Sequence, residues 1–209
     1  MTPRVKICGL TTPEDVDAAV SAGADALGFI VDVSSATPRE IDAATAATLV
    51  DRVPPFVTTV LVTMGEDPGA IAALTQLTGV DAVQLHGALT TTLEAVQATV
   101  DTPVIAGVDP GAAAAATAAD AVLLDATDAD GAGGTGDTHD WDRAATIATD
   151  LDTPVILAGG LTPTNVAEAI ATVDPYAVDV ATGVEASGGQ KDHDAVHAFI
   201  AAAGRRPQA

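Results

Sequence analysis

The sequence has one cysteine, few basic residues and no long apolar run, and each of these shortages excludes a class of protein. Its 209 residues include one cysteine, which excludes an internal disulfide and a multi-cysteine metal site. Only 8 residues are Lys or Arg against 29 Asp or Glu, and a formal charge of -21 argues against a nucleic-acid partner. No apolar run approaches the roughly 18 residues that span a bilayer, and the N-terminus carries no export pattern. We therefore expect a cytoplasmic protein with no membrane partner.

The remaining composition is that of a folded protein despite the acidic excess. Hydrophobic residues make up 48% of the chain and aromatic residues 2%. A chain of this length supports one core, so we expect a single domain over residues 1–209. The repulsion among so many carboxylates opposes compaction unless salt screens it. We therefore expect a halophilic source and unfolding on dialysis to low salt.

Short apolar segments alternate with helical patterns and divide the chain into eight strand–helix units. The patterns predict strands at 4–8, 26–30, 58–62, 82–85, 103–108, 121–125, 155–158 and 177–181. They predict helices ending near 22 and at 42–52, 68–77, 89–98, 141–149, 164–173 and 192–203, with an Ala-rich helix after Asp109-Pro110.

Eight such units in about 200 residues predict an α/β fold, a parallel (βα)8 barrel ringed by helices. An open doubly wound sheet is the structural alternative. Internal repetition favours the barrel, because the pattern of 9–20 recurs at 160–170. Period-two alternation turns residues such as Val83 and Leu85 toward the helices and Gln84 toward the interior.

Two groups with proton chemistry stand at the carboxyl ends of predicted strands, where such barrels carry their active sites. Cys8 ends the first strand and Asp125 ends the sixth. Each has an ordinary structural explanation, a small buried residue for the cysteine and a turn ligand for the aspartate. Together they are typical of a base and acid pair.

Lys6 lies on the same strand face as Cys8, and Asp179 on the last strand is placed to pair with it. The pair can be an interior ion pair that only fills the barrel. A cation beside the cysteine would nevertheless favour thiolate over thiol.

Two glycine-containing loops and one arginine are candidate binding groups. Gly159-Gly160 follows the seventh strand and Thr182-Gly183 the eighth, the two loops with which such barrels commonly hold a phosphate through backbone N–H groups. No basic residue directly follows either strand, so a dianion there relies on neutral dipoles. Arg39, after the second strand, suits a substrate carboxylate, although it can instead pair with neighbouring Glu40.

Two further patterns receive a weaker functional interpretation. The loop 126–140 contains a glycine-rich run at 131–136 and is interpreted as a lid or a long mobile loop. His193 and His197 have metal-ligand spacing, but no third ligand is evident and we expect no metal.

With these residues in place, the chain resembles the phosphoribosylanthranilate isomerase family, tryptophan-pathway enzymes with a (βα)8 barrel. The resemblance runs from Val5 to about Ile200. It rests on the motifs Lys6-Ile7-Cys8-Gly9, Gln84-Leu85-His86-Gly87, Leu123-Leu124-Asp125, Gly133-Gly134-Thr135-Gly136 before Asp140-Trp141, Gly159-Gly160-Leu161, Asp179 to Glu185, and Lys191-Asp192-His193-Asp194.

The resemblance implies an Amadori rearrangement of N-(5-phosphoribosyl)anthranilate that needs no metal or cofactor. It implies that Asp125 is the general acid, Cys8 the general base, and Arg39 the partner of the anthranilate carboxylate. The family's glycine-rich loop commonly ends in lysine where this chain has Asp137. The alternatives are another phosphosugar barrel enzyme and a non-catalytic phosphoester-binding barrel. The sequence leaves open whether the protein is a monomer or a homodimer.

Overall fold

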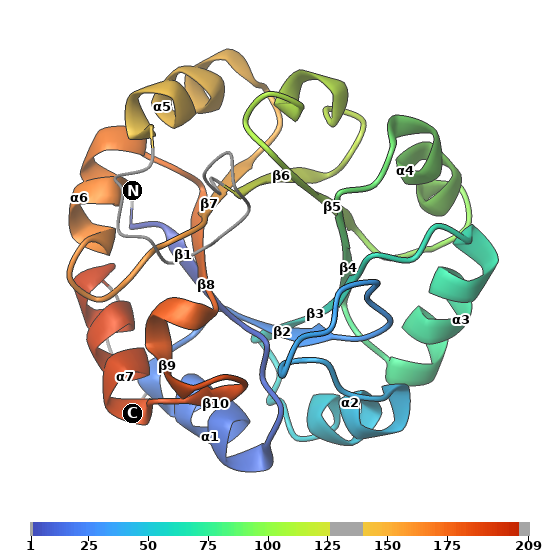
Figure 1. The fold of residues 1–209 in the computed structure, drawn as a ribbon, viewed down its shortest axis with the longest axis horizontal. Coiled ribbons are helices and arrows are strands. Elements are labelled where there is room, and N and C mark those ends of the chain that lie inside the picture. Colours follow the sequence, from blue (N-terminus) through green and yellow to red (C-terminus); the bar gives the residue numbers. More distant parts are fainter. Residues whose placement is uncertain (1, 126–139, 205–209) are drawn as a thin grey trace.

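A closed barrel of eight parallel strands forms the centre of the molecule (Figure 1). The computed structural model describes residues 2–125 and 140–204, so the glycine-rich run at 131–136 and Asp137 lie outside the described residues. Each strand pairs with the next in the chain, and β1 pairs with β8 to close the ring. The strands are β1 (Arg4–Cys8), β2 (Ala26–Ile30), β3 (Thr58–Thr63), β4 (Ala82–His86), β5 (Val104–Val108), β6 (Ala121–Asp125), β7 (Val155–Ala158) and β8 (Ala177–Val180). The predicted barrel is confirmed.

The α-helices of the described chain form an outer ring around the strands (Figure 1). They are α1 (Pro13–Ala22), α2 (Ala43–Val50), α3 (Pro68–Thr78), α4 (Thr90–Gln97), α5 (Trp141–Asp150), α6 (Val166–Val173) and α7 (His193–Ala202). Each lies within about two residues of its predicted bounds, the usual uncertainty of helix ends. None of the described helices is long and apolar enough to cross a membrane.

The prediction of an Ala-rich helix after Asp109-Pro110 is wrong. The structure has a single 3₁₀ turn there, η1 (Ala113–Ala115), within a run of i to i+3 backbone hydrogen bonds. The buried residues Ala113, Ala116 and Ala119 recur at every third position, which matches three residues per turn and not 3.6. Alanine favours helix by propensity, but its methyl group buries little area, and a short helix needs a packed apolar face. An apolar recess of about 220 Å³ remains between η1 and α4.

Acidic side chains begin many of the helices. The N-cap residue accepts a hydrogen bond from the first turn in five of the described α-helices, namely at Thr12, Asp42, Asp67, Asp140 and Asp192. Such a cap contributes about 1 kcal/mol, and a carboxylate there also faces the positive end of the helix dipole. Part of the acidic excess therefore has a local structural role.

Alternation along the strands separates an outer core from an inner one. Val83 and Leu85 on β4 belong to the large cluster between barrel and helices, as the alternation predicts. The interior holds two smaller clusters, one of them around Cys8. Polar side chains also lie buried on the strands, including Lys6, Gln84 and Asp179.

The chain adds a small hairpin between β8 and α7. After the 3₁₀ turn η2 (Thr182–Val184), β9 (Glu185–Ser187) pairs antiparallel with β10 (Gln190–Lys191). This hairpin lies beside the segment that connects β2 to α2, which itself pairs with β2 at one bridge between Ile30 and Glu40. The segments after β2 and β8 are thus brought together at the mouth of the barrel.

Candidate active site

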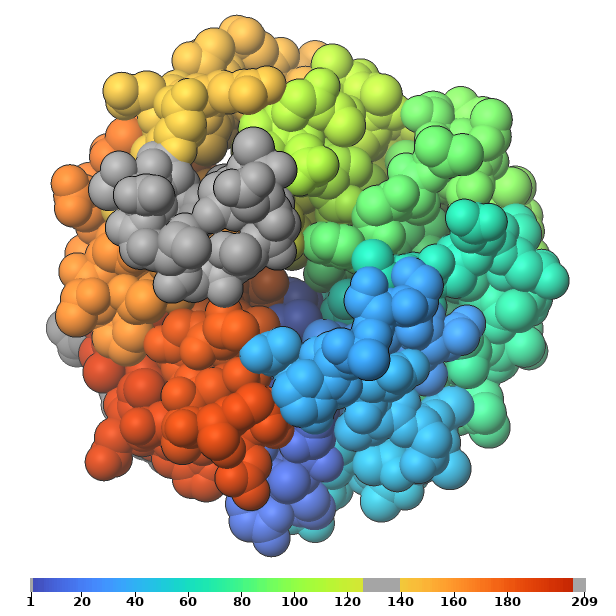
Figure 2. Space-filling view, viewed as in Figure 1, coloured from blue at the N-terminus to red at the C-terminus, as the bar shows by residue number. Residues whose placement is uncertain are grey.

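Cys8 is buried at the carboxyl end of β1, with 5% of its surface exposed. Its Sγ and the Nζ of Lys6 lie 2.8 and 3.1 Å from the point where a Cβ on Gly28 would stand, so glycine leaves the space these two groups share. Burial raises the pKa of the Cys8 thiol, and the Lys6 ammonium acts against that rise. Cys8 is thus a thiol whose ionisation depends on its charged neighbours. Dark-blue atoms of the N-terminal segment are visible at the bottom of a hollow at the centre of this face (Figure 2).

Lys6 and Asp179 form a buried ion pair inside the barrel. The register of β1 on β8 sets the two residues opposite each other, and Lys6 Nζ lies 2.8 Å from Asp179 Oδ1. Burial alone would lower the pKa of Lys6, but the Asp179 carboxylate and Cys8 outweigh it and raise that pKa. Lys6 is therefore a fixed cation at neutral pH.

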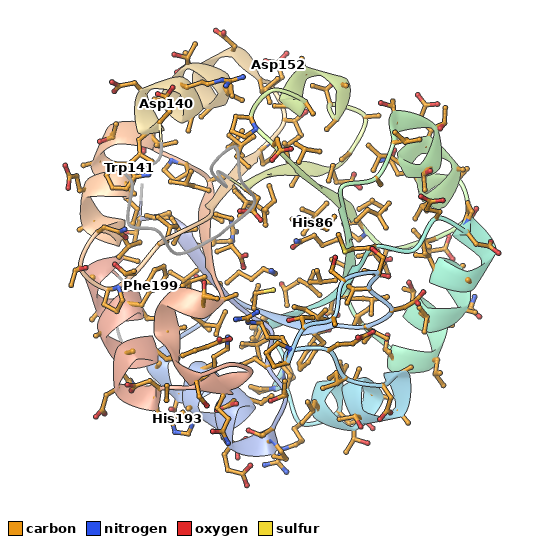
Figure 3. All side chains as sticks on the ribbon, viewed as in Figure 1. His86, Asp140, Trp141, Asp152, His193 and Phe199 are labelled. Atoms are coloured by element: carbon orange, nitrogen blue, oxygen red, sulfur yellow. The ribbon has the colours of Figure 1, made fainter. Side chains whose placement is uncertain are left out.

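Asp125 ends β6, and 26% of its side chain is exposed. His86, at the end of β4, lies with its Nε2 3.8 Å from Asp125 Oδ2, beyond hydrogen-bond distance. The ring lies toward the centre of the barrel mouth (Figure 3). Sequence reasoning quoted His86 only inside a motif. Its position as the last residue of an alternating strand, facing inward, is the signal that would have identified it.

The alternative interpretation, in which Arg39 pairs with neighbouring Glu40, is wrong, because Arg39 pairs with Glu185. Its Nε and Nη2 donate to the two carboxylate oxygens of Glu185, at 2.7 and 2.8 Å, and these hydrogen bonds raise the pKa of Arg39. A Cβ on Gly9 would stand 2.8 Å from Arg39 Cδ, which sets the arginine stem directly over the end of β1. Arg39 therefore lies next to Cys8 in the fold.

Lys191 completes this group, and in the sequence it was named only as part of the motif Lys191-Asp192-His193-Asp194. Its Nζ donates to Glu185 Oε1 at 2.9 Å and to the carbonyl of Ala181 at 3.0 Å. Burial would raise the pKa of Glu185, but its hydrogen bonds from Arg39 and Lys191 lower it. The burial of Lys191 comes from the tertiary structure, so the sequence carried no signal for it.

The loops after β7 and β8 touch each other. A Cβ on Gly183 would overlap the carbonyl oxygen of Leu161, so only glycine allows this approach. Gly159 and Gly160 have φ of 82° and 57°, in the left-handed region that glycine adopts readily. Asn165 braces the first loop by accepting from Thr162 N and donating to the Gly160 carbonyl. The four predicted residues Gly159, Gly160, Thr182 and Gly183 therefore come from two adjoining loops.

Other polar groups lie apart from these contacts. Gln84 is buried, and its Oε1 has no hydrogen-bond partner among the described residues. His193 lies on α7 at the rim of the molecule (Figure 3), where its Nε2 is 2.9 Å from Asp15 Oδ1. Within residues 2–125 and 140–204, no three His, Cys, Asp or Glu side chains gather to hold a metal.

A closed barrel of eight parallel strands ringed by helices, with a thiol and a carboxylate at the ends of β1 and β6, defines a TIM-barrel protein. The sequence model of the N-(5'phosphoribosyl)anthranilate (PRA) isomerase family matches residues 5–202. The chain belongs to this family.

Individual relatives agree over nearly the whole chain. An N-(5'-phosphoribosyl)anthranilate isomerase from the halophilic archaeon Natronomonas pharaonis is 55% identical, over 96% of this chain and 98% of the relative. The crystal structure of phosphoribosyl anthranilate isomerase from Thermotoga maritima matches with a TM-score of 0.86 and 35% identity, over 97% of this chain and 98% of that one. A second such enzyme, in complex with reduced 1-(o-carboxyphenylamino)-1-deoxyribulose 5-phosphate, matches with a TM-score of 0.81 and 33% identity, over the same shares of the two chains.

Proposed function

We propose that the protein catalyses the Amadori rearrangement of N-(5-phosphoribosyl)anthranilate to 1-(2-carboxyphenylamino)-1-deoxyribulose 5-phosphate, a step of tryptophan biosynthesis. The family match over residues 5–202 carries this proposal. The reaction is an isomerisation, so every proton removed from the substrate is matched by one added.

Asp125 is the general acid in this proposal. Its proton goes to the ring oxygen of the furanose, the bond from that oxygen to C1 breaks, and the nitrogen lone pair forms an iminium at C1. The partial exposure of the carboxyl, 26%, is compatible with access by substrate. His86, 3.8 Å away, is close enough to form a hydrogen bond to Asp125 after a small movement.

Cys8 is the general base. Its thiolate removes the proton from C2, which gives an enolamine. Protonation at C1 together with loss of the proton from the C2 hydroxyl then leaves a ketone at C2. The thiolate needs help because burial raises the pKa of Cys8. Lys6 supplies that help, and Asp179 keeps Lys6 beside the sulfur through the 2.8 Å ion pair.

The two ends of the substrate are held by separate parts of the mouth. The adjoining loops of Gly159-Gly160 and Thr182-Gly183 suit the phosphate, because backbone N–H groups can reach it where no cation directly follows either strand. Arg39 suits the anthranilate carboxylate. Buried Gln84, with an unpartnered Oε1 in the described structure, supports the barrel floor below them.

The test is turnover of freshly generated substrate by the purified protein in multimolar salt, followed by loss of the anthranilate fluorescence. Cys8→Ala and Asp125→Asn are each expected to reduce kcat by at least about a hundredfold, because each removes a proton-transfer group. Binding of the reduced product named above should persist in both variants. Near-wild-type turnover in either variant contradicts that residue's role, and a folded wild type without turnover contradicts the proposed function.

We also propose that residues 1–209 form one domain that acts in the cytoplasm as a monomer or a homodimer. The closed barrel from β1 to β8 supports the single domain, since no subset of strands closes by itself. Sedimentation of the purified protein distinguishes the two oligomeric states.

A further inference from the structure

Arg39, Glu185 and Lys191 form one chain of ion pairs across the mouth of the barrel. Arg39 donates two hydrogen bonds to Glu185 from one edge of its guanidinium, at 2.7 and 2.8 Å. Lys191 donates to the same carboxylate at 2.9 Å. A single carboxylate thus lies between two cations from different segments of the chain.

The net charge of this group differs from that of the Arg39–Glu185 pair alone. A carboxylate paired with an arginine cancels its charge, and a second anion gains little from a neutral pair. Lys191 adds one positive charge, so the three residues together carry a net positive charge. In a protein of formal charge -21, this local sign decides whether an anionic ligand is attracted.

The guanidinium also keeps free donors in this arrangement. Of its five N–H groups, Glu185 takes two and the hydroxyl of Thr37 takes one, through Nη1 at 3.2 Å. Two N–H groups remain without a partner among the described residues. They are available to a second carboxylate.

Burial keeps this arrangement effective at high salt. The side chain of Lys191 is 0% exposed and that of Glu185 is 6% exposed, while Arg39 is 19% exposed. Salt screens buried pairs much less than exposed ones. Only the arginine, the outermost member, is accessible to a ligand.

The backbone around the three residues is braced. The β9–β10 hairpin that carries Glu185 and Lys191 packs on Pro38, the neighbour of Arg39, at both Gly188 and Gly189. Thr11 Oγ1 donates to the Gly189 carbonyl at 2.7 Å. Figure 2 shows the red surface of the C-terminal segment side by side with the light-blue surface of the segment after β2.

We propose that Lys191 is a positioning residue that acts through Glu185 to keep Arg39 fixed in a net positive environment, and so sets the preference for a carboxylate on the aromatic ring. This inference rests on the proposed function, in which Arg39 binds that carboxylate. Lys191 itself does not touch the substrate.

The test is Lys191→Met, which leaves Glu185 and Arg39 as a neutral pair. Two competitive inhibitors are compared in high salt, the reduced carboxyphenylamino product and the corresponding phenylamino compound without the carboxylate. The carboxylated inhibitor is expected to bind on the order of tenfold more weakly, and the other inhibitor is expected to bind as before. KM should rise by a larger factor than kcat falls, since Lys191 also lowers the pKa of Cys8, and Lys191→Arg should restore both constants.

A double variant tests the charge argument directly. Glu185→Gln with Lys191→Met removes both charges and leaves Arg39 as the only ion, so the preference for the carboxylated inhibitor should return. The one charge left unpaired in this variant is that of Arg39, the most exposed of the three at 19%. The variant also keeps the test open if Lys191→Met fails to fold by circular dichroism. Arg52→Met is the matched control, since it removes a cation from the exposed pair with Asp17.

The outcomes separate the inference from the proposed function. Equal weakening of both inhibitors by Lys191→Met, or no weakening, overturns the positioning role, as does a double variant that does not recover the preference. If Arg39→Met abolishes the preference while Lys191→Met preserves it, the inference fails and the carboxylate role of Arg39 stands. If Arg39→Met also preserves it, the carboxylate role fails with the inference.

Discussion

The buried ion pair of Lys6 and Asp179 gives the sharpest prediction about stability and ionisation. The two side chains are 4% and 10% exposed and 2.8 Å apart, so neither charge can be solvated by water if its partner is removed. Lys6→Met and Asp179→Asn are each expected to cost about 3–5 kcal/mol of unfolding free energy, because each leaves one uncompensated charge. That is a large share of a total of roughly 5–15 kcal/mol.

The double variant Lys6→Met/Asp179→Asn should lose less than either single variant. It buries no charge, and its remaining cost is that of one unpaired amide, about 1–3 kcal/mol. The assay is urea unfolding of all four proteins at one fixed high salt concentration and neutral pH. Because the pKa of Lys6 is raised, its stabilising effect is fully present below the ordinary lysine pKa and is lost only as the pH rises through the raised value.

The two single variants should move the ionisation of Cys8 in opposite directions. Burial is the largest cause of the raised pKa of Cys8; Lys6 lowers that pKa and Asp179 raises it. The acid limb of kcat/KM should therefore move to higher pH in Lys6→Met and to lower pH in Asp179→Asn.

The control cycle uses the exposed pair of Arg52 and Asp17, which lie 2.7 Å apart at 45% and 62% exposure. Its coupling should not exceed about 1 kcal/mol. A double variant at Lys6 and Asp179 that loses the full sum of the single losses would refute the reasoning. So would a pH profile that shifts in the same direction in both single variants.

Two further predictions concern the phosphate loops and the acidic surface. Gly183→Ala should raise KM roughly tenfold or more, because the new methyl group displaces the loop that contains Leu161. The control is Gly79→Ala, which has φ of 68° and no atom within 4 Å of the new methyl group, and which should lower stability without changing KM. Equal KM values in both variants would contradict the loop contact. Dialysis from multimolar salt to salt-free buffer should unfold the wild type, seen as loss of helical circular dichroism. The reason is that the screening length grows from about 3 Å at 1 M to about 30 Å at 0.01 M, so the carboxylates of a chain of formal charge -21 repel one another over longer distances. A protein that stays folded would show that this repulsion does not determine its stability.

The local patterns predicted most of the fold. Period-two alternation placed Val83 and Leu85 in the outer core, and Thr12-Pro13 marked the first turn of α1, because a cap and a proline act on the next few residues only. The exception is the Ala-rich segment around η1. Helix propensity favoured a helix there, and the lack of large side chains to pack overrode it.

The candidate site was predicted in part. Cys8 and Asp125 were located from their places at strand ends, and the roles assigned to them remain predictions. His86 and Lys191 were named only inside motifs. The place of His86 at the end of an alternating strand was a usable signal, whereas the burial of Lys191 comes from the tertiary structure.

By itself the sequence determined the order of strands and helices, the strand face shared by Lys6 and Cys8, and the strongly acidic charge, because each depends on composition or on neighbours a few residues away. Only the tertiary structure decided that Arg39 pairs with Glu185, 146 residues further along, and not with adjacent Glu40. The choice depends on closure of the barrel, which brings the segment after β2 against the hairpin after β8 and buries their charges together. Sequence proximity cannot predict a pairing whose free energy comes from that shared burial.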